Sequence, residues 1–255
     1  MSEASGRTAA FETAAGCGAS IRMRQLLAGR DVARTHPVAG QLRNQMYLVW
    51  EPASKEAMLV DPCWDVGGLV ELAEEEHGFE LVGVLLTHAH PDHVGGDLFG
   101  LEVEGLGRFL ELRELPVWMH EAELPVLAGV TGLGPETIAD LRLTADGDRI
   151  PLGDDKIRCL FTPGHSPGGQ CFLFGGDAIV GDTLFVGAIG RLDLPGADPD
   201  AMWHSLERLK TLPPETRIHP GHDYGRAPSS TIAEELASNP YLQLESLAAW
   251  RRVVG

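Results

Sequence analysis

The densest group of chemically reactive side chains in the sequence is the run Thr87-His88-Ala89-His90-Pro91-Asp92-His93. Three histidines and one aspartate fall within six residues, directly after the apolar segment 81–86. Imidazole and carboxylate at this spacing are the ligands that zinc, iron and manganese take in proteins. We therefore predict a metal site here rather than a set of solvated loop histidines.

The apolar segment 81–86 determines how these ligands point. It is short and continuously apolar, which is typical of a buried strand. At the end of such a strand the chain is still extended, so His88 and His90, two residues apart, point the same way. The proline and glycines that follow turn the chain, and Asp92 and His93 then project in another direction. This division predicts two neighbouring metal ions.

Three further predicted strands end in a lone histidine or aspartate among prolines and glycines. Segment 157–161 is followed by His165, segment 178–180 by Asp182, and segment 217–218 by His222. A single histidine in such a loop is usually a surface group. The shared position just past a strand nevertheless makes these three residues candidate ligands alongside the first cluster.

In chain order, the candidate ligands resemble the pattern of the metallo-β-lactamase fold superfamily: His88, His90, Asp92, His93, His165, Asp182 and His222. The resemblance covers most of the chain, from Asn44 to Tyr241. It implies an α/β fold, a four-layer αβ/βα sandwich with the metals in a cleft at one edge of two central sheets. It also implies that Asp61 supports the metal site from behind the ligands, and that His120, at the end of another strand, has a structural role.

The resemblance also implies how the ligands are shared. One metal would take His88, His90 and His165, the other Asp92, His93 and His222, and Asp182 would bridge both. A bridging aspartate is similar to the glyoxalase II (hydroxyacylglutathione hydrolase) group rather than to the true β-lactamases.

Two further positions match residues that lie near a glutathione moiety in glyoxalase II-like and persulfide dioxygenase-like proteins. These are Arg191 and Tyr224, and we predict that they bind substrate. A structural ion pair with a neighbouring aspartate is the alternative for Arg191, and packing is the alternative for Tyr224.

The expected chemistry follows from two adjacent divalent ions. They would lower the pKa of a shared water towards neutrality, so that a metal-bound hydroxide attacks a carbonyl, and they would stabilise the resulting oxyanion. The sequence shows no additional general acid for a poor leaving group. That favours an ester or thioester over an amide, because a thiolate (thiol pKa about 8.5) departs without a proton.

We therefore predict a glyoxalase II-like hydrolase of a small acyl thioester or ester, with an acylglutathione as candidate substrate. Asp92 and Asp182 are the predicted catalytic carboxylates. Zinc is the first choice of metal, with iron and manganese as alternatives because the same ligands accept all three.

An oxidation is the alternative. The stretch His222-Asp223-Tyr224-Gly225, together with Ser230-Thr231-Ile232 and Asn239-Pro240, resembles persulfide dioxygenases. Those enzymes hold one Fe(II) by two histidines and a carboxylate, here His88, His165 and Asp182, and this one would act on glutathione persulfide. Segments 181–187 and 190–196 look more like glyoxalase II-like hydrolases, which favours the hydrolase.

Bulk properties fit a small-molecule enzyme. The chain has 255 residues, 44% of them hydrophobic, enough for one α/β domain, which we place at 21–255 after a disordered segment 1–20. The net charge of -17 disfavours nucleic acid and anionic membranes as partners. The first twenty residues contain no apolar stretch of membrane or signal type, and the four cysteines are scattered, so we expect a cytoplasmic protein. Oligomeric state is left open.

Five segments outside the ligand loops have recognisable patterns. Segments 66–77 and 199–209 have one apolar face each and predict outer helices. Segments 229–239 and 242–253 also predict helices. Segment 98–115, interrupted by three glycines, predicts a loop bordering the active site.

Overall fold

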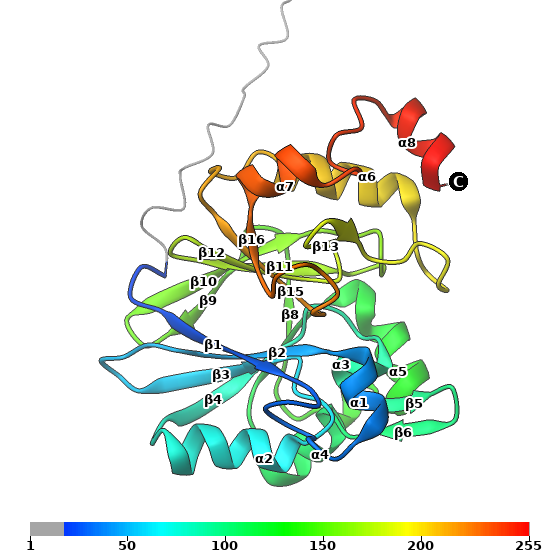
Figure 1. Cartoon of the computed structure of the whole chain (residues 1–255). Helices are drawn as coiled ribbons and strands as arrows, with labels where there is room; N and C mark the ends of the chain where they lie inside the picture. Colours follow the sequence, from blue (N-terminus) through cyan, green and yellow to red (C-terminus); the bar gives the residue numbers. More distant parts are fainter. Residues whose placement is uncertain (1–17, 255) are drawn as a thin grey trace, which may run out of the picture.

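Two six-stranded sheets dominate the computed structural model, which describes residues 18–254 (Figure 1). The first sheet contains, in spatial order, β1 (Arg22–Leu27), β2 (Gln45–Trp50), β3 (Glu56–Val60), β4 (Glu80–Leu85), β7 (Val117–His120) and β8 (Leu141–Thr144). The second contains β16 (Ser230–Thr231), β15 (Arg217–Pro220), β12 (Asp177–Gly181), β11 (Gln170–Phe174), β10 (Asp155–Phe161) and β9 (Arg149–Leu152).

The alternation of side chains along the strands explains why the sheets pack face to face. In β2, Tyr47 and Val49 belong to the core between the sheets, whereas Met46 and Leu48 belong to the core beneath the helices. Successive side chains of a strand point to opposite faces, so a strand that is apolar on both faces must be covered on both.

Helices cover the outer face of each sheet. On the first sheet lie α2 (Val66–Glu71), its π-helical continuation η1 (Leu72–Glu76), α4 (Leu106–Leu112) and α5 (Leu124–Thr131); on the second lie α6 (Pro199–Leu209), α7 (Ile232–Ser238) and α8 (Leu247–Val254) (Figure 1). This arrangement of helices, sheet, sheet and helices confirms the predicted four-layer sandwich. Among residues 18–254, no helix combines the length and apolar character needed to cross a membrane.

Short elements complete the described chain. They are α1 (Pro37–Leu42), α3 (Pro91–Val94), η2 (Glu121–Glu123), η3 (Pro135–Thr137), the hairpin of β5 (Gly96–Leu98) with β6 (Leu101–Val103), and the hairpin of β13 (Leu184–Phe185) with β14 (Ala188–Ile189).

The helix predicted over 199–209 is confirmed as α6. Asp198 caps it by accepting hydrogen bonds from the backbone N–H groups of Asp200 and Ala201, and Pro199 occupies the first turn. The predicted helix over 66–77 is confirmed as α2 and η1. The C-terminal predictions are confirmed as the shorter α7 and α8.

The prediction of a loop over 98–115 is wrong. The segment forms β6 and α4, and α4 buries Leu106 and Phe109 against the first sheet. The glycines that suggested a loop lie at the hairpin turn and at the helix start: Gly100 has φ +86, and Gly105 is the residue before α4. Burial of apolar side chains outweighs the low helix propensity of Gly107.

Most of the predicted disordered segment, 1–17, lies outside the described residues. Ser20 belongs to the described part: its backbone N–H and its hydroxyl donate to Asp155 at 3.0 and 2.9 Å.

The ends of the central strands bring the predicted ligand loops to one edge of the sandwich. β3 runs parallel to β4 in one sheet and β12 runs parallel to β15 in the other, so each pair ends on the same side. The two sheets are close here, because the Gln170 backbone N–H donates to the Thr87 carbonyl at 2.9 Å. A Cβ on Gly181, which has φ +48, would meet Thr87 Oγ1 at 2.7 Å, so glycine suits both the turn and the space.

Candidate metal centre

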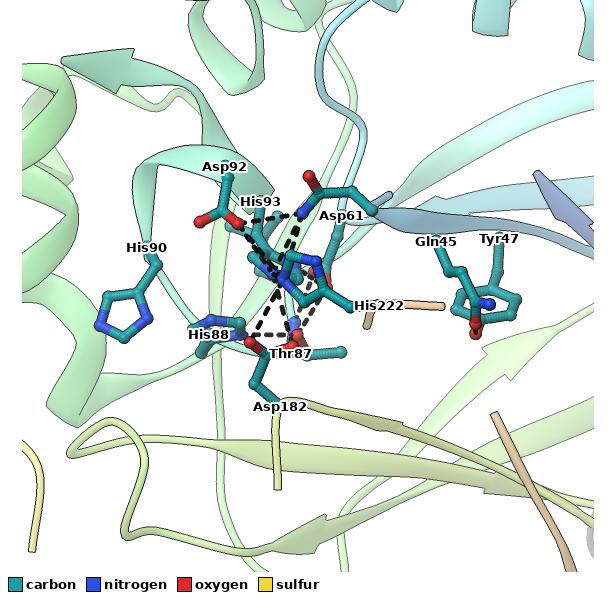
Figure 2. A network of polar contacts seen from close by, with 12 residues as sticks. Gln45, Tyr47, Asp61, Thr87, His88, His90, Asp92, His93, Asp182 and His222 are labelled. Carbon is teal, nitrogen blue, oxygen red and sulfur yellow. Dashed lines mark hydrogen bonds and ion pairs between the residues drawn. The ribbon is translucent and has the colours of Figure 1, made fainter. Parts of the chain in front are cut away.

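Six of the seven predicted ligands converge at this edge in two main groups. His88, His90 and His165 each offer a ligand atom within 4.8 Å of the others, and so do Asp92, His93 and His222. A third, overlapping group contains Asp61, His88 and His93. Figure 2 shows Asp92, His93 and His222 pointing towards one another, with Asp182 approaching from the other sheet.

Hydrogen bonds fix the tautomer of His88. The Thr87 hydroxyl lies 2.5 Å from Asp61 Oδ2, to which it donates, so its oxygen accepts from His88 Nδ1 at 3.0 Å. The proton of the neutral ring is therefore on Nδ1, and Nε2 keeps its lone pair. That Nε2 atom is buried and has no hydrogen-bond partner among the described residues. His88 thus presents to the centre a nitrogen lone pair that can bind a metal ion.

His90 and His165 face each other. Their rings approach with His90 Nδ1 and His165 Nε2 2.9 Å apart. The outer nitrogen of His165, Nδ1, donates to the Arg191 carbonyl at 2.9 Å, which leaves Nε2 directed at the centre. Three imidazoles arranged in this way match the donor set of a divalent transition metal.

Outer hydrogen bonds orient the second group in the same manner. Nδ1 of His93 lies 3.1 Å from Asp61 Oδ2, and Nδ1 of His222 lies 2.7 Å from the Leu42 carbonyl. Both Nε2 atoms therefore face inwards, 3.2 Å apart. The predicted role of Asp61 behind the ligands agrees with its contact to His93, and its φ of +50 turns the chain at the end of β3.

Asp182 lies between the two groups. Its Oδ2 is 3.5 Å from His165 Nε2 and 3.4 Å from His222 Nε2, and its Oδ1 is 3.5 Å from His93 Nε2. Oδ1 is buried and, like His88 Nε2, accepts no hydrogen bond from a described residue. Two orphaned lone pairs in one buried, polar place are costly unless a cation takes them up, so the donor set fits divalent metals.

Protonation differs between the two groups. Burial, reinforced by the neighbouring histidines, lowers the pKa of His88 well below its usual value, and burial with His165 lowers the pKa of His90 to about 4. Burial also opposes charge on His93 and His222, but the adjacent carboxylates outweigh it, so the pKa of each is raised. For Asp92 the charged histidines outweigh burial and lower the pKa.

Asn44 is a centre residue to which the sequence assigned no role. Its amide Nδ2 donates to Asp92 Oδ2 at 3.1 Å, and its Oδ1 accepts from Trp64 Nε1 at 2.9 Å. The tryptophan thereby fixes which end of the amide faces Asp92. A single asparagine before an apolar strand carries no sequence signal for this role.

The two predicted substrate residues lie at the centre's outer side. Tyr224 is 51% exposed, and its ring stacks on that of His222 with centroids 4.6 Å apart. The exposed Arg191 side chain makes two hydrogen bonds to Asp193, at 2.9 and 2.8 Å. The ion pair that was the alternative for Arg191 is therefore present, and the backbone of this residue holds His165.

His120 lies outside the ligand groups of the described chain. It caps the following turn through Nδ1, which accepts from the Ala122 backbone N–H at 3.2 Å, and its ring stacks on Phe161 with centroids 4.1 Å apart.

A family model described as metallo-beta-lactamase superfamily matches residues 39–222, which include every predicted ligand. The chain belongs to this superfamily. It is 33% identical to the hydroxyacylglutathione hydrolase of Methylococcus capsulatus, with 80% of this chain and 84% of that protein covered. It is 30% identical to the mitochondrial persulfide dioxygenase ETHE1 of Bos taurus, with 90% of this chain and 79% of that protein covered.

A solved structure of a superfamily member agrees with the fold. The crystal structure of ETHE1 from Myxococcus xanthus matches with a TM-score of 0.74 and 26% identity, covering 91% of this chain and 89% of that one. The predicted resemblance to glyoxalase II-like and persulfide dioxygenase-like members is confirmed. These similarities do not separate hydrolysis from oxidation.

Proposed function

We propose that this protein is a metal-dependent hydrolase of a small acyl thioester or ester. The observation that carries the proposal is the place of Asp182, whose two carboxylate oxygens face His165 and His222 on one side and His93 on the other. A carboxylate between two complete ligand groups suits a two-metal centre. Zinc is the proposed metal, with iron and manganese as alternatives.

Two bound divalent ions would supply a hydroxide nucleophile near neutral pH and stabilise an oxyanion. The chain's own groups prepare that centre. Asp182 would set the spacing of the two ligand groups, and Asp92, held by Asn44, would give the second group an anionic ligand. The leaving thiolate needs no protein acid, because it departs unprotonated.

The outer side of the centre supports a substrate with an anionic carrier. Tyr224 presents an exposed ring beside His222, and burial raises its pKa, so the hydroxyl remains a hydrogen-bond donor at neutral pH. The guanidinium of Arg191 is largely exposed and is paired with the carboxylate of Asp193, which is also largely exposed. We propose that both contact the carrier portion of a glutathione conjugate.

A mononuclear iron persulfide dioxygenase is the second candidate. The alignment with the bovine persulfide dioxygenase over 90% of this chain favours it. It would need only two histidines and one carboxylate, here His88, His165 and Asp182. It leaves the converging group of Asp92, His93 and His222 without a role, and for that reason we rank it second.

A substrate panel on anaerobically purified protein tests the proposal. We expect hydrolysis of an acylglutathione, which is measured by the free thiol that it releases, and no oxygen consumption. Oxygen uptake with glutathione persulfide and no thioester cleavage would overturn the hydrolase. An acyl ester of similar size serves as the comparison for the leaving group.

The remaining parts of the proposal concern partners and location. A small molecule is the proposed partner, and the acidic charge of -17 argues against nucleic acid. We propose a cytoplasmic location. The buried cysteines Cys63, Cys159 and Cys171 are free thiols, as is usual in a reducing compartment.

A further inference from the structure

Glu123 is a buried carboxylate that touches two of the ligand loops. It is the last residue of η2, which follows β7, and only 1% of its surface is exposed. One carboxylate oxygen accepts from the Ala89 backbone N–H at 2.8 Å, and the other accepts from the Gly168 backbone N–H at 2.5 Å. Its partners come from the loop of His88 and His90 and from the loop of His165.

The position of each N–H group makes these bonds relevant to the metal. Ala89 lies between His88 and His90 in the chain, so fixing its N–H fixes the backbone from which both rings extend. Gly168 closes the loop that begins after β10 and carries His165. All three residues of the first ligand group are therefore tied to one side chain.

A second residue, Gln170, also joins the same two loops. The side-chain amide of Gln170 donates to the Leu86 carbonyl at 3.0 Å, and its backbone N–H donates to the Thr87 carbonyl. The loops are thus joined both by Gln170 and by Glu123. Without Glu123, two buried N–H groups would lose their acceptor.

The space around Glu123 is shaped for this contact. A Cβ on Gly168 would lie 2.8 Å from Glu123 Cγ and 2.9 Å from its backbone nitrogen, so a larger residue would push the glutamate away. A buried carboxylate is costly without hydrogen-bond partners, and among residues 18–254 the partners of this one are the two loop N–H groups.

We propose that Glu123 is a positioning residue that sets the separation of the two loops holding the His88, His90 and His165 metal, with no direct role in the Asp92, His93 and His222 metal. This inference rests on the proposed ligand groups. Residues that orient metal ligands from behind alter affinity by about 10- to 100-fold when they are changed.

The test uses zinc alone as the probe, in two backgrounds that each keep one ligand group. His222→Ala leaves the first group intact, and His165→Ala leaves the second. Glu123→Gln is added to each, because glutamine keeps the size but turns an NH2 group towards one backbone N–H. Zinc affinity is measured by competition with a chromophoric chelator, and folding by circular dichroism.

We expect Glu123→Gln to raise the zinc Kd about tenfold in the His222→Ala background and to leave it unchanged in the His165→Ala background. Equal weakening in both backgrounds would mean general destabilisation and overturn the proposal, and so would no effect in either. If neither background binds zinc, the ligand assignment itself fails, which would overturn the proposed function together with this inference.

Two further variants keep the result interpretable. Gly168→Ala displaces the Glu123 side chain without removing its carboxylate. It should weaken zinc binding in the His222→Ala background only, and it serves as the test if Glu123→Gln does not fold. Glu51→Gln is the matched control, since Glu51 also accepts two backbone N–H bonds, from Ala53 and Ser54 on the turn after β2. It should leave zinc binding unchanged in both backgrounds, and a loss as large as that of Glu123→Gln would contradict the proposal.

Discussion

The two ligand groups of the centre are built in different ways. The first, His88, His90 and His165, contains only imidazoles, and burial lowers the pKa of His88 and His90. The second contains a carboxylate, and its histidines have raised pKa values. Burial disfavours charge on His88 and His90, whereas in the second group the carboxylates favour charge on the histidines.

The supports of the two groups differ as well. In the second group, neighbouring side chains bind the ligands directly: Asn44 binds Asp92, and Asp61 binds His93. In the first group, Thr87 also binds His88 directly, but Glu123 acts on the backbone between the ligands. The comparison predicts that a substitution can weaken metal binding by one group without weakening the other, and Asp182 is the residue that lies between the two groups.

Removing the joining residue should have the largest effect. Asp182→Ala should lower thioester turnover by more than about 100-fold, the upper end of the loss when only a residue behind a ligand is changed. The fold should remain, because the residue lies at a sheet edge and not in the apolar core. Steady-state kinetics and circular dichroism check this, and turnover at the wild-type level would refute the two-metal centre.

Acidification should lower the zinc affinity of the two ligand groups to different extents. A metal binds neutral imidazole, so a raised pKa means that protons compete at a higher pH. Zinc affinity of the second group should therefore fall by about tenfold or more between about pH 7.5 and 5.5, while that of the first group changes less. Zinc titrations of His165→Ala and His222→Ala at both pH values measure the difference, and parallel curves would remove the contrast.

Asn44→Ala should weaken the second group alone. It removes the hydrogen bond to Asp92 and leaves the Trp64 indole without its acceptor. We expect about a tenfold loss of zinc affinity in the His165→Ala background and none in the His222→Ala background. An effect confined to the His222→Ala background would mean that Asn44 supports the first ligand group and not the second, which would contradict the prediction.

Arg191→Ala should have the smallest effect, because this side chain is exposed and already paired. We expect the KM for a glutathione thioester to rise about two- to fivefold, with little change in kcat. The KM for a neutral thioester should stay the same. Equal changes for both substrates would remove the proposed anion contact.

The convergence of the candidate ligands could be predicted from sequence, because each of them follows a strand in a loop rich in histidine, proline or glycine. Strand ends at one sheet edge meet in space, so local patterns around His88, His165 and His222 were sufficient. The family pattern then supplied the four-layer order of helices and sheets.

Residues that act across the fold could not be predicted in this way. Glu123 meets Ala89 and Gly168, which lie 34 and 45 residues away, and no local pattern marks such a pair. Asn44 likewise acts through Asp92, 48 residues away. The helix α4 was missed for the opposite reason: local glycines suggested a loop, but tertiary burial of Phe109 decided the outcome.

The most direct test of the central claim is a count of metal ions per chain in three proteins purified without chelator. Elemental analysis should give about two for the wild type and about one each for His165→Ala and His222→Ala. One metal in the wild type that is lost in His165→Ala and retained in His222→Ala would contradict the two-metal account and support the single-iron alternative.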